Sequence, residues 1–294
     1  MGALDGRVAI VTGAGRGLGR AHALLLASQG AMVVVNDSGA AMDGSSGEDR
    51  QRPAQQVVDL IAEAGGTAVA NYDDVTDWKG GMSLVAQAID TFGALHALVN
   101  NAGILRDRVL VNMGEEDWDD VVRVHLRGHF VPTRHAASYW RAQAKAGQEM
   151  NARVVNTSST SGLLGNPGQS NYGAAKAGIA AFTVIAAQEL SRYGVRVNAI
   201  APAARTRMTE STPGLKEMVQ PPPDGRGFDI WDPANVSPLV GYLASTYCQV
   251  TGRVFYIQGG TIRVFLPWTM DATIEKDGRF SVEELVEQIP HIAG

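Results

Sequence analysis

The stretch TGAGRGLG (residues 12–19) lies between the apolar run RVAIVT (Arg7–Thr12) and the segment GLGRAHALLLASQG (Gly17–Gly30). The run before it is typical of a buried strand, and the segment after it has helical spacing and a terminal glycine. A glycine-rich turn lets the chain bend sharply and leaves backbone N–H groups at a helix N-terminus open to a phosphate. A tight strand–helix turn without a ligand is the alternative, but the context favours a nucleotide site. The loop residues assigned to that site are Gly13, Arg16, Gly17, Leu18 and Gly19.

The alternation of short apolar runs with longer helical segments continues along the chain. Seven strands that alternate with helices indicate a mostly parallel sheet with helices on both faces. The sequence therefore predicts an α/β protein with a single Rossmann-type, doubly wound parallel sheet. Strands are expected within residues 7–12, 32–37, 68–74, 96–103, 153–159, 195–202 and 252–260, and helices within residues 17–30, 52–66, 83–93, 171–194, 235–245 and, as one long helix, 117–146.

Two long polar segments interrupt this alternation. Ser38–Gln51 is rich in glycine, and Pro213–Pro233 contains three consecutive prolines. Loops of this length in a compact domain are usually functional, so a substrate loop is expected at about residues 205–233.

The end of the chain departs from the pattern as well. A dinucleotide-binding domain is expected over residues 1–260, followed by a tail at residues 261–294. Within the tail, Ser281 and Glu284 stand at capping-box spacing, and Pro290 follows. The tail is therefore expected to form a short helix that docks on the same domain.

Composition restricts the class of protein. Of the 294 residues, 45% are hydrophobic and 19% charged, which is ordinary for a globular protein, and the net charge of −5 indicates no nucleic-acid binding. Cys248 is the single cysteine, so no internal disulfide forms, which suits a reducing compartment. The N-terminal residues lack the pattern of a signal peptide, and no apolar run reaches membrane-spanning length. These features predict a cytoplasmic protein.

Asp37, at the end of the second predicted strand, bears on cofactor choice. A carboxylate there can accept hydrogen bonds from a ribose 2′-hydroxyl and would repel a 2′-phosphate. Arg16 argues the other way, because its guanidinium could pair with that phosphate. Asp37 carries more weight, since bringing like charges together is costly, and the sequence predicts NAD rather than NADP.

Tyr172 and Lys176 are four residues apart in SNYGAAK, so they share one face of a predicted helix. A tyrosine ordinarily has a pKa near ~10, and a fixed ammonium nearby stabilises the phenolate and lowers that value. Ser159 stands at the end of a predicted strand, where sites in parallel sheets gather. Packing of small residues in a helix is the alternative interpretation of SNYGAAK.

The glycine loop, NNAG (Asn100–Gly103), Ser159 and Tyr-x-x-x-Lys, in this order, resemble the short-chain dehydrogenase/reductase family over about Leu4–Gly260. The resemblance implies that Tyr172 is the general acid/base, Lys176 lowers its pKa and binds the nicotinamide ribose, and Ser159 holds the reacting oxygen. It also implies further cofactor contacts at Asp74, Val75, Asn101, Ala102, Gly103, Pro202, Ala203 and Thr206.

The peptides VVVND, NNAGILRDR, VHLRG and IAPAARTRMT are similar to a narrower group, the (3R)-hydroxyacyl-CoA dehydrogenase modules of peroxisomal multifunctional enzymes of type 2. This likeness implies an acyl-CoA thioester or a steroid as the substrate. Where many family members have Asn, VHLRG has His125, which can also bond a water or a carbonyl, so His125 is expected to join the proton relay. Its spacing to His129 does not indicate a metal site, and a packed or solvated pair is expected.

Several alternatives remain open at this point. An NADPH-dependent ketoacyl or ketosteroid reductase would use the same residues in the opposite direction, and a dinucleotide-sensing scaffold would keep the fold without catalysis. Arg106–Arg108 could be a salt-paired surface turn or a rim that meets the substrate. The helices around Tyr172 and within residues 117–146 could pair across a two-fold axis, so a homodimer or homotetramer is expected.

Overall fold

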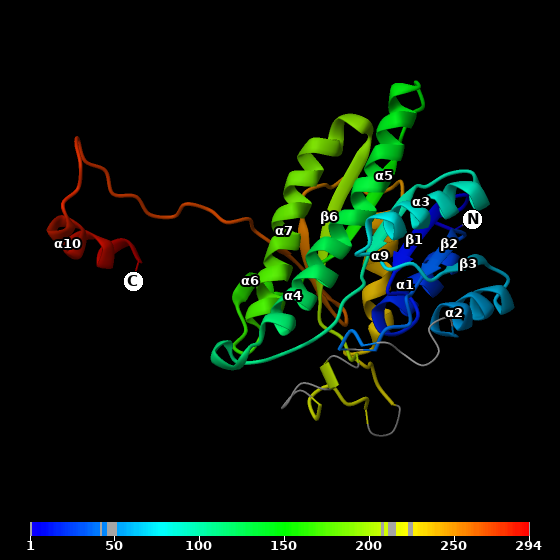
Figure 1. Cartoon of the computed structure of the whole chain (residues 1–294), viewed down its shortest axis with the longest axis horizontal. Helices are drawn as coiled ribbons and strands as arrows, with labels where there is room; N and C mark the ends of the chain where they lie inside the picture. Colours follow the sequence, from blue (N-terminus) through cyan, green and yellow to red (C-terminus); the bar gives the residue numbers. More distant parts are fainter. Residues whose placement is uncertain are drawn as a thin grey trace. The chain divides into compact units, whose positions relative to one another are not determined.

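The computed structural model describes residues 2–41, 43–45, 52–206, 209–210, 216–222 and 226–293. Within these residues, eight strands form one sheet in the order β3-β2-β1-β4-β5-β6-β7-β8 (Figure 1). The strands are β1 (Val8–Thr12), β2 (Met32–Asn36), β3 (Thr67–Asn71), β4 (Ala97–Asn100), β5 (Ala152–Thr157), β6 (Val195–Pro202), β7 (Val254–Gln258) and β8 (Thr261–Phe265). The helices are α1 (Gly17–Ser28), α2 (Arg52–Glu63), α3 (Trp78–Phe92), α4 (Glu115–Val122), α5 (Gly128–Lys145), α6 (Thr160–Leu164), α7 (Ser170–Leu190), α9 (Ser237–Ala244) and α10 (Val282–Ala293).

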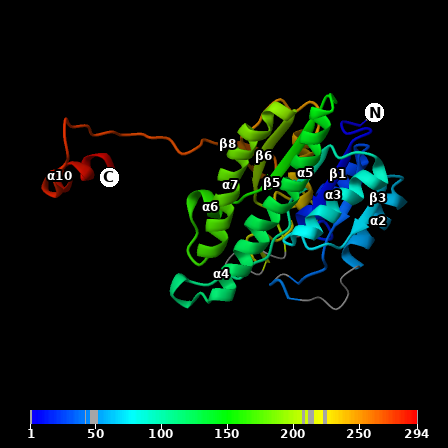
Figure 2. The ribbon, with the colours of Figure 1, turned by 45° about the horizontal axis from the view of Figure 1, so that its top comes forward.

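The sheet has a separate hydrophobic core on each face, which confirms the predicted doubly wound architecture. Strands β1 to β7 pair in parallel, and their alternate side chains point to opposite faces. In β2, Val33 and Val35 belong to the core that includes side chains of α1, α2 and α9, whereas Val34 belongs to the core that includes side chains of α3, α5 and α7. Figure 2 shows α3, α5 and α7 side by side over one face of the sheet. Burial on both faces explains why the strands are continuous apolar runs.

The strand order places the site. The chain leaves β1 toward β2 and β3 on one side and returns to β4 on the other, so β1 and β4 are neighbours. Loops that leave two such strands in opposite directions open a crevice at their carboxyl ends. The glycine loop after β1 and the NNAG segment after β4 meet at this crevice.

The long helix predicted over residues 117–146 is interrupted. Helix α4 ends at Val122, a π-helical turn spans Arg123–Arg127, and α5 continues from Gly128. A π-helical turn closes its hydrogen bonds over one additional residue, and it is frequent at functional sites. Here it contains His125.

The end of the chain also differs from the prediction. The strand β8 was expected as tail, but it follows β7 after a two-residue turn that contains Gly259 at φ +50°. Such a short connection joins antiparallel neighbours. The chain divides into two compact units, one up to Val264 and one from Phe265 onward.

The second unit contains the predicted tail helix, α10. Its capping box is present, since Glu284 N donates to Ser281 Oγ at 3.2 Å and Ser281 N donates to Glu284 Oε2 at 2.7 Å. Pro290 lies inside this helix rather than after it. Docking of the tail on the main domain stays a prediction. None of the helices that the structure describes combines the length and apolar character needed to span a bilayer.

Candidate active site

A cavity of about 370 Å³ opens at the carboxyl ends of the central strands. It brings together most of the residues predicted for the cofactor and for catalysis. The predicted residues that line it are Gly13, Arg16, Gly17, Leu18, Asp37, Asp74, Val75, Asn101, Ala102, Gly103, His125, Tyr172, Lys176, Pro202 and Thr206. Gly19, Ala203 and Ser159 are not among the lining residues. Those that line it without having been predicted include Arg123 and Ser158.

The glycine loop has the shape that a pyrophosphate requires. Gly13 and Gly17 have φ of +60° and +53°, values that side chains disfavour, and a Cβ on Gly13 would come within 2.8 Å of the Ala102 Cα. Gly19 packs beneath this loop, since a Cβ there would collide with the Gly13 carbonyl. Helix α1 begins without a side-chain cap and without an acidic residue in its first turn. Its free N–H groups and dipole therefore suit an anionic ligand, and the loop fits a dinucleotide.

Asp37 braces the loops around the cavity. Its Oδ2 accepts from Gly15 N at 2.8 Å, and its Oδ1 accepts from Gly39 N at 2.8 Å. A carboxylate has about four acceptor positions, so these two bonds leave capacity for ribose hydroxyls. The bracing role was not predicted, although an Asp two residues before a Gly is a common turn signal.

Asn101 holds the same loop from the other side. Its Nδ2 donates to the carbonyls of Thr12 and Gly13 at 3.1 Å each, and its backbone N donates to Thr12 Oγ1 at 2.9 Å. Both amide hydrogens are thus engaged within the protein. Asn101 therefore fixes β4 to the glycine loop, and only its side-chain oxygen is left to face a ligand.

Lys176 and Tyr172 lie together at one end of the cavity. The Lys176 Nζ donates to the Thr157 carbonyl at 2.6 Å and lies 5.4 Å from the centre of the Tyr172 ring. The lysine is 2% exposed, and burial lowers its pKa to about 7. Ser159 caps α6 by accepting from Ser161 N at 3.1 Å, and its hydroxyl acts on the Tyr172 phenol by lowering the pKa of that group. The three predicted side chains are thus in one cluster.

The pKa of Tyr172 shifts in the opposite direction to the prediction. Burial raises it to about 12, the hydrogen bond with Ser159 opposes the rise, and the negative charge of Asp107 adds to it. Desolvation thus outweighs the interactions that favour the phenolate in the protein without ligand, and the role of Lys176 in lowering this pKa stays a prediction. The ammonium lies over the ring and bonds a carbonyl.

His125 is held beside the tyrosine by the π-helical turn. Its Nε2 lies 2.8 Å from the Ile104 carbonyl, and its ring meets the Tyr172 ring edge-on with centroids 5.1 Å apart. Gly103 makes room for it, since a Cβ there would lie 3.0 Å from Nδ1. Burial, together with the charge of Lys176, holds the pKa of His125 well below its ordinary value. The imidazole is therefore neutral, and its Nδ1 is buried without a hydrogen-bond partner among the described residues.

His129 supports the lysine indirectly. Its Nε2 accepts from Thr157 N at 3.3 Å, while the Thr157 carbonyl accepts from Lys176 Nζ. Both histidines are 1% exposed, which agrees with the packed pair that was expected. Within the described part of the chain, no cluster of three or more His, Cys, Asp or Glu side chains could hold a metal ion.

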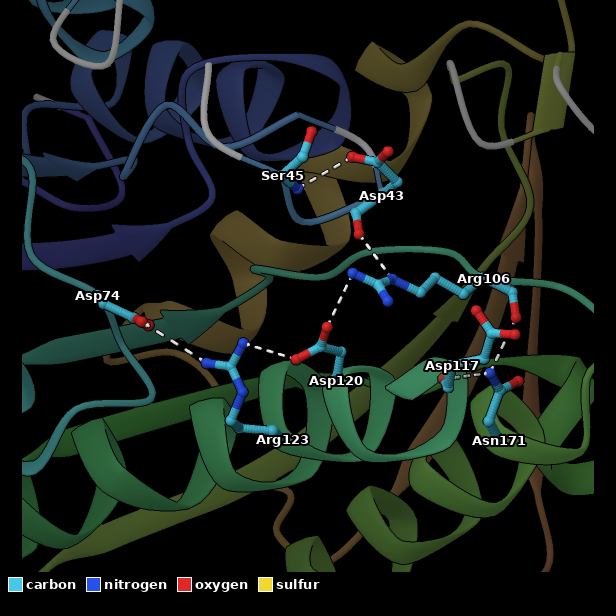
Figure 3. Close-up of polar contacts among 8 residues, drawn as sticks. All are labelled: Asp43, Ser45, Asp74, Arg106, Asp117, Asp120, Arg123 and Asn171. Carbon is cyan, nitrogen blue, oxygen red and sulfur yellow. Dashed lines mark hydrogen bonds and ion pairs between the residues drawn. The ribbon is translucent and has the colours of Figure 1, made fainter. Parts of the chain in front are cut away.

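Arg106, Asp107 and Arg108 do not form a salt-paired turn among themselves. Arg106 pairs with Asp120 at 2.8 Å (Figure 3), Asp107 accepts from Gln169 at 2.7 Å, and Arg108 lies 4.0 Å from Asp117. Each side chain ties the segment after β4 to a different part of α4 or to the residue before α7. In the expected substrate loop, Met208, Met218, Phe228 and Trp231 could line an apolar acyl pocket or only pack the loop, and Met208 lies outside the described residues.

Comparison with known proteins agrees with this site. Residues 7–217 match the short chain dehydrogenase family. Hydroxyacyl-CoA dehydrogenase ChsB1 of Mycobacterium tuberculosis is 46% identical over 278 residues, which cover 94% of this chain and 84% of that protein. Peroxisomal multifunctional enzyme type 2 of Mus musculus is 42% identical over 284 residues, 96% of this chain but 36% of that enzyme.

A solved structure extends the similarity to three dimensions. The crystal structure of a short chain dehydrogenase from Mycobacterium avium has a TM-score of 0.88 and 51% sequence identity, and the match covers 99% of this chain and 96% of that one. The family match spans the glycine loop, the segment after β4 and the Tyr–Lys helix. The chain therefore belongs to the short-chain dehydrogenase family and is an NAD(P)-dependent oxidoreductase acting on CH–OH groups.

Proposed function

We propose that this protein oxidises a secondary alcohol to a ketone with NAD, and that its substrate is a (3R)-hydroxyacyl-CoA with a fatty-acyl or sterol side chain. The observation that carries the proposal is the cluster of Ser159, Tyr172 and Lys176 beside the glycine loop. The relatives named as a hydroxyacyl-CoA dehydrogenase and as a peroxisomal multifunctional enzyme support the substrate class.

The chain's own residues would position the alcohol and manage its proton. Bound NAD would supply the hydride acceptor. Tyr172 would receive the hydroxyl proton as the general base, and Ser159 would hold the oxygen through its hydroxyl. Burial raises the pKa of the phenol to about 12 and lowers that of Lys176 to about 7, so each group by itself favours its neutral form. Opposite charges attract, so an ionised Tyr172 and a protonated Lys176 would stabilise one another. A proton leaving the phenol is thus coupled to the charge on the lysine.

His125 would contribute to the same proton path. Its contact with Ile104 fixes the ring, and the unpartnered Nδ1 offers one buried position to a water molecule. His125 is therefore proposed as part of the relay in place of the asparagine that is common in the family.

Asp37 supports NAD over NADP. Its carboxylate lines the cavity together with Arg16, and its two bonds to backbone N–H groups fix its position. A carboxylate fixed in this position accepts hydrogen bonds from ribose hydroxyls and repels a 2′-phosphate.

Two further features stay predictions. A homodimer or homotetramer is expected, with α5 and α7 as the paired helices. Exposed apolar side chains on these helices, Phe130 at 41% and Ile185 at 53%, support that arrangement. A cytoplasmic location rests on the sequence features described above.

Activity with defined thioesters tests the proposal. Purified protein would be assayed for NADH formation at 340 nm with (3R)- and (3S)-3-hydroxyacyl-CoA esters of several chain lengths, and with hydroxysteroids. We expect turnover of the (3R) esters with NAD, and loss of that turnover in Tyr172→Phe.

The same assay separates the alternatives. Turnover of 3-ketoacyl esters with NADPH, and none in the oxidative direction with NAD, would identify a reductase. Saturable NAD binding without turnover of any substrate in the panel would favour a sensing scaffold.

A further inference from the structure

A chain of charged groups runs along the cavity from the turn at Asp43 to Asp74 (Figure 3). Arg106 Nε donates to the Asp43 carbonyl at 2.9 Å, and its Nη2 lies 2.8 Å from Asp120 Oδ2. The other oxygen of Asp120 accepts from Arg123 Nη2 at 3.0 Å, and Arg123 Nη1 lies 3.7 Å from Asp74 Oδ2. We refer to Arg106, Asp120 and Arg123 together as the Arg106 strap.

Both ends of the strap border the cofactor cavity. Ala41 and Gly44, in the turn that contains Asp43, line the cavity on one side, and Asp74 and Arg123 line it as well. The turn also packs closely on the segment after β4, since a Cβ on Gly44 would lie 3.1 Å from Ile104 Cδ1. The strap thus joins two walls that lie far apart in the sequence.

The geometry is more constrained than that of an isolated surface pair. The side chains of Arg106 and Asp120 are 22% and 31% exposed, and one carboxylate orients two guanidinium groups. Arg123 Nη1 also donates to Thr76 Oγ1 at 2.8 Å. Isolated exposed ion pairs contribute little, but shared partners reduce the freedom of each side chain.

Arg106 also connects the cavity wall to the catalytic helix. Its backbone carbonyl accepts from Asn171 Nδ2 at 2.9 Å, and the same amide nitrogen donates to the Asp117 carbonyl at 2.8 Å (Figure 3). The Asn171 Oδ1 accepts from Tyr172 N at 2.7 Å, and Asn171 is fully buried. The loop that carries Arg106 is thereby fixed to the first turn of α7.

We propose that the Arg106 strap holds the turn at Asp43 against the adenosine half of the cofactor cavity, so that its three residues are positioning residues for the dinucleotide. The adenosine half is the relevant one because two cavity-lining residues adjoin the strapped walls: Asp37, assigned to the ribose hydroxyls, and Asp74, which matches an adenine-contacting position in the family resemblance. The inference rests on the proposed function, since it takes this cavity as the NAD site.

Binding measurements on matched variants test the strap. Asp120→Asn and Arg106→Gln remove one charge each from the strap. Asp119→Asn and Arg108→Gln are matched controls, because they make the same charge changes at an exposed neighbour on α4 and at an arginine that is 58% exposed. The dissociation constants of NAD and of ADP-ribose would be measured by isothermal titration calorimetry, together with the thermal midpoint without ligand.

We expect both strap variants to bind NAD roughly five- to twentyfold more weakly, and ADP-ribose more weakly by the same factor, while the controls stay within about twofold of wild type. The variant that combines Asp120→Asn with Arg106→Gln should bind NAD no more weakly than the single variant with the larger dissociation constant. Both changes break the same connection, so their effects should not add. Wild-type affinity for NAD in the strap variants, with only a lower thermal midpoint, would overturn the inference and leave a purely structural ion pair.

The design separates this inference from the function on which it rests. If wild-type protein bound neither NAD nor ADP-ribose, the cofactor assignment would fail and the strap inference with it. If wild type bound both ligands and the strap variants matched it, the inference alone would fail and the proposed function would stand.

Discussion

Replacing Asp37 with alanine is expected to lower the stability of the protein without ligand and to weaken its preference for NAD. The two effects can be measured separately. In the structure its carboxylate accepts from Gly15 N and Gly39 N at 2.8 Å each, and it also lines the cavity. Without ligand, the variant loses these two bonds, although water can replace part of each. A net loss of about 1–2 kcal/mol is expected, which lowers the thermal midpoint by about 2–8 °C in a protein of this size.

The cofactor effect adds to that loss. With NAD the carboxylate would accept ribose hydroxyls, and with NADP it would face a phosphate of like charge. Bonds to a charged acceptor contribute about 1.5–3 kcal/mol each. Wild type is therefore expected to favour NAD by at least roughly a hundredfold in kcat/KM, which corresponds to about 2.7 kcal/mol. Asp37→Ala should narrow this preference mainly by weakening NAD, and Arg16→Ala added to it should restore part of the preference by weakening NADP.

Steady-state kinetics with both cofactors on wild type and the two variants measure these effects. Asp59→Ala is the matched control, because Asp59 is an exposed carboxylate on α2 that accepts from Gln55. It changes the net charge equally and should leave both kcat/KM values within about twofold. A wild-type preference for NADP, or an unchanged kcat/KM for NAD in Asp37→Ala, would refute the reasoning.

Tyr172→Phe should abolish turnover, while the dissociation constant of NAD, measured by titration, stays near the wild-type value. Lys176→Ala should impair both turnover and NAD binding. If Tyr172→Phe kept most of its kcat, SNYGAAK would be a packing motif. His125→Asn should keep most activity, whereas His125→Ala should lose roughly tenfold or more in kcat, about 1.4 kcal/mol in the barrier; equal rates for wild type and His125→Ala would exclude the relay role. His22 is fully buried beside Ser237 and burial lowers its pKa to about 3, so the unfolded state binds the extra proton between pH 6.5 and about 3. The free energy of unfolding should therefore decrease as pH falls through that window. Measured by denaturant titration, it should decrease less steeply for His22→Gln than for wild type; an identical pH slope for the two proteins would contradict this assignment.

The central fold and the location of the site were predictable because they depend on local order along the chain. Gly13, Asp37 and Ser159 each follow a recognisable apolar strand, and parallel strands bring their carboxyl ends to one edge of the sheet. Tyr172 and Lys176 share a helix face by spacing alone.

The features that were missed depend on contacts that sequence patterns do not encode. A π-helical turn at His125 adds one residue to a helix without changing its composition, so Arg123–Arg127 looked like ordinary helix. The edge strand β8 exposes four of its five residues to solvent and lacks the continuous apolar character of the others. The direction of the Tyr172 pKa depends on how much water the folded site excludes, and the pairing of Arg106 with Asp120 joins residues from separate elements.

The peptide unit at the end of β5 has a consequence for how the protein assembles. Thr157 is anchored twice, with its N–H to His129 on α5 and its carbonyl to Lys176 on α7. The two anchors together require that both helices have docked on the same face of the sheet beside β5, which lies between β4 and β6. Recovery of helix content during refolding is therefore not enough to place the lysine, and recovery of enzymatic activity would report that the packing on this face is complete.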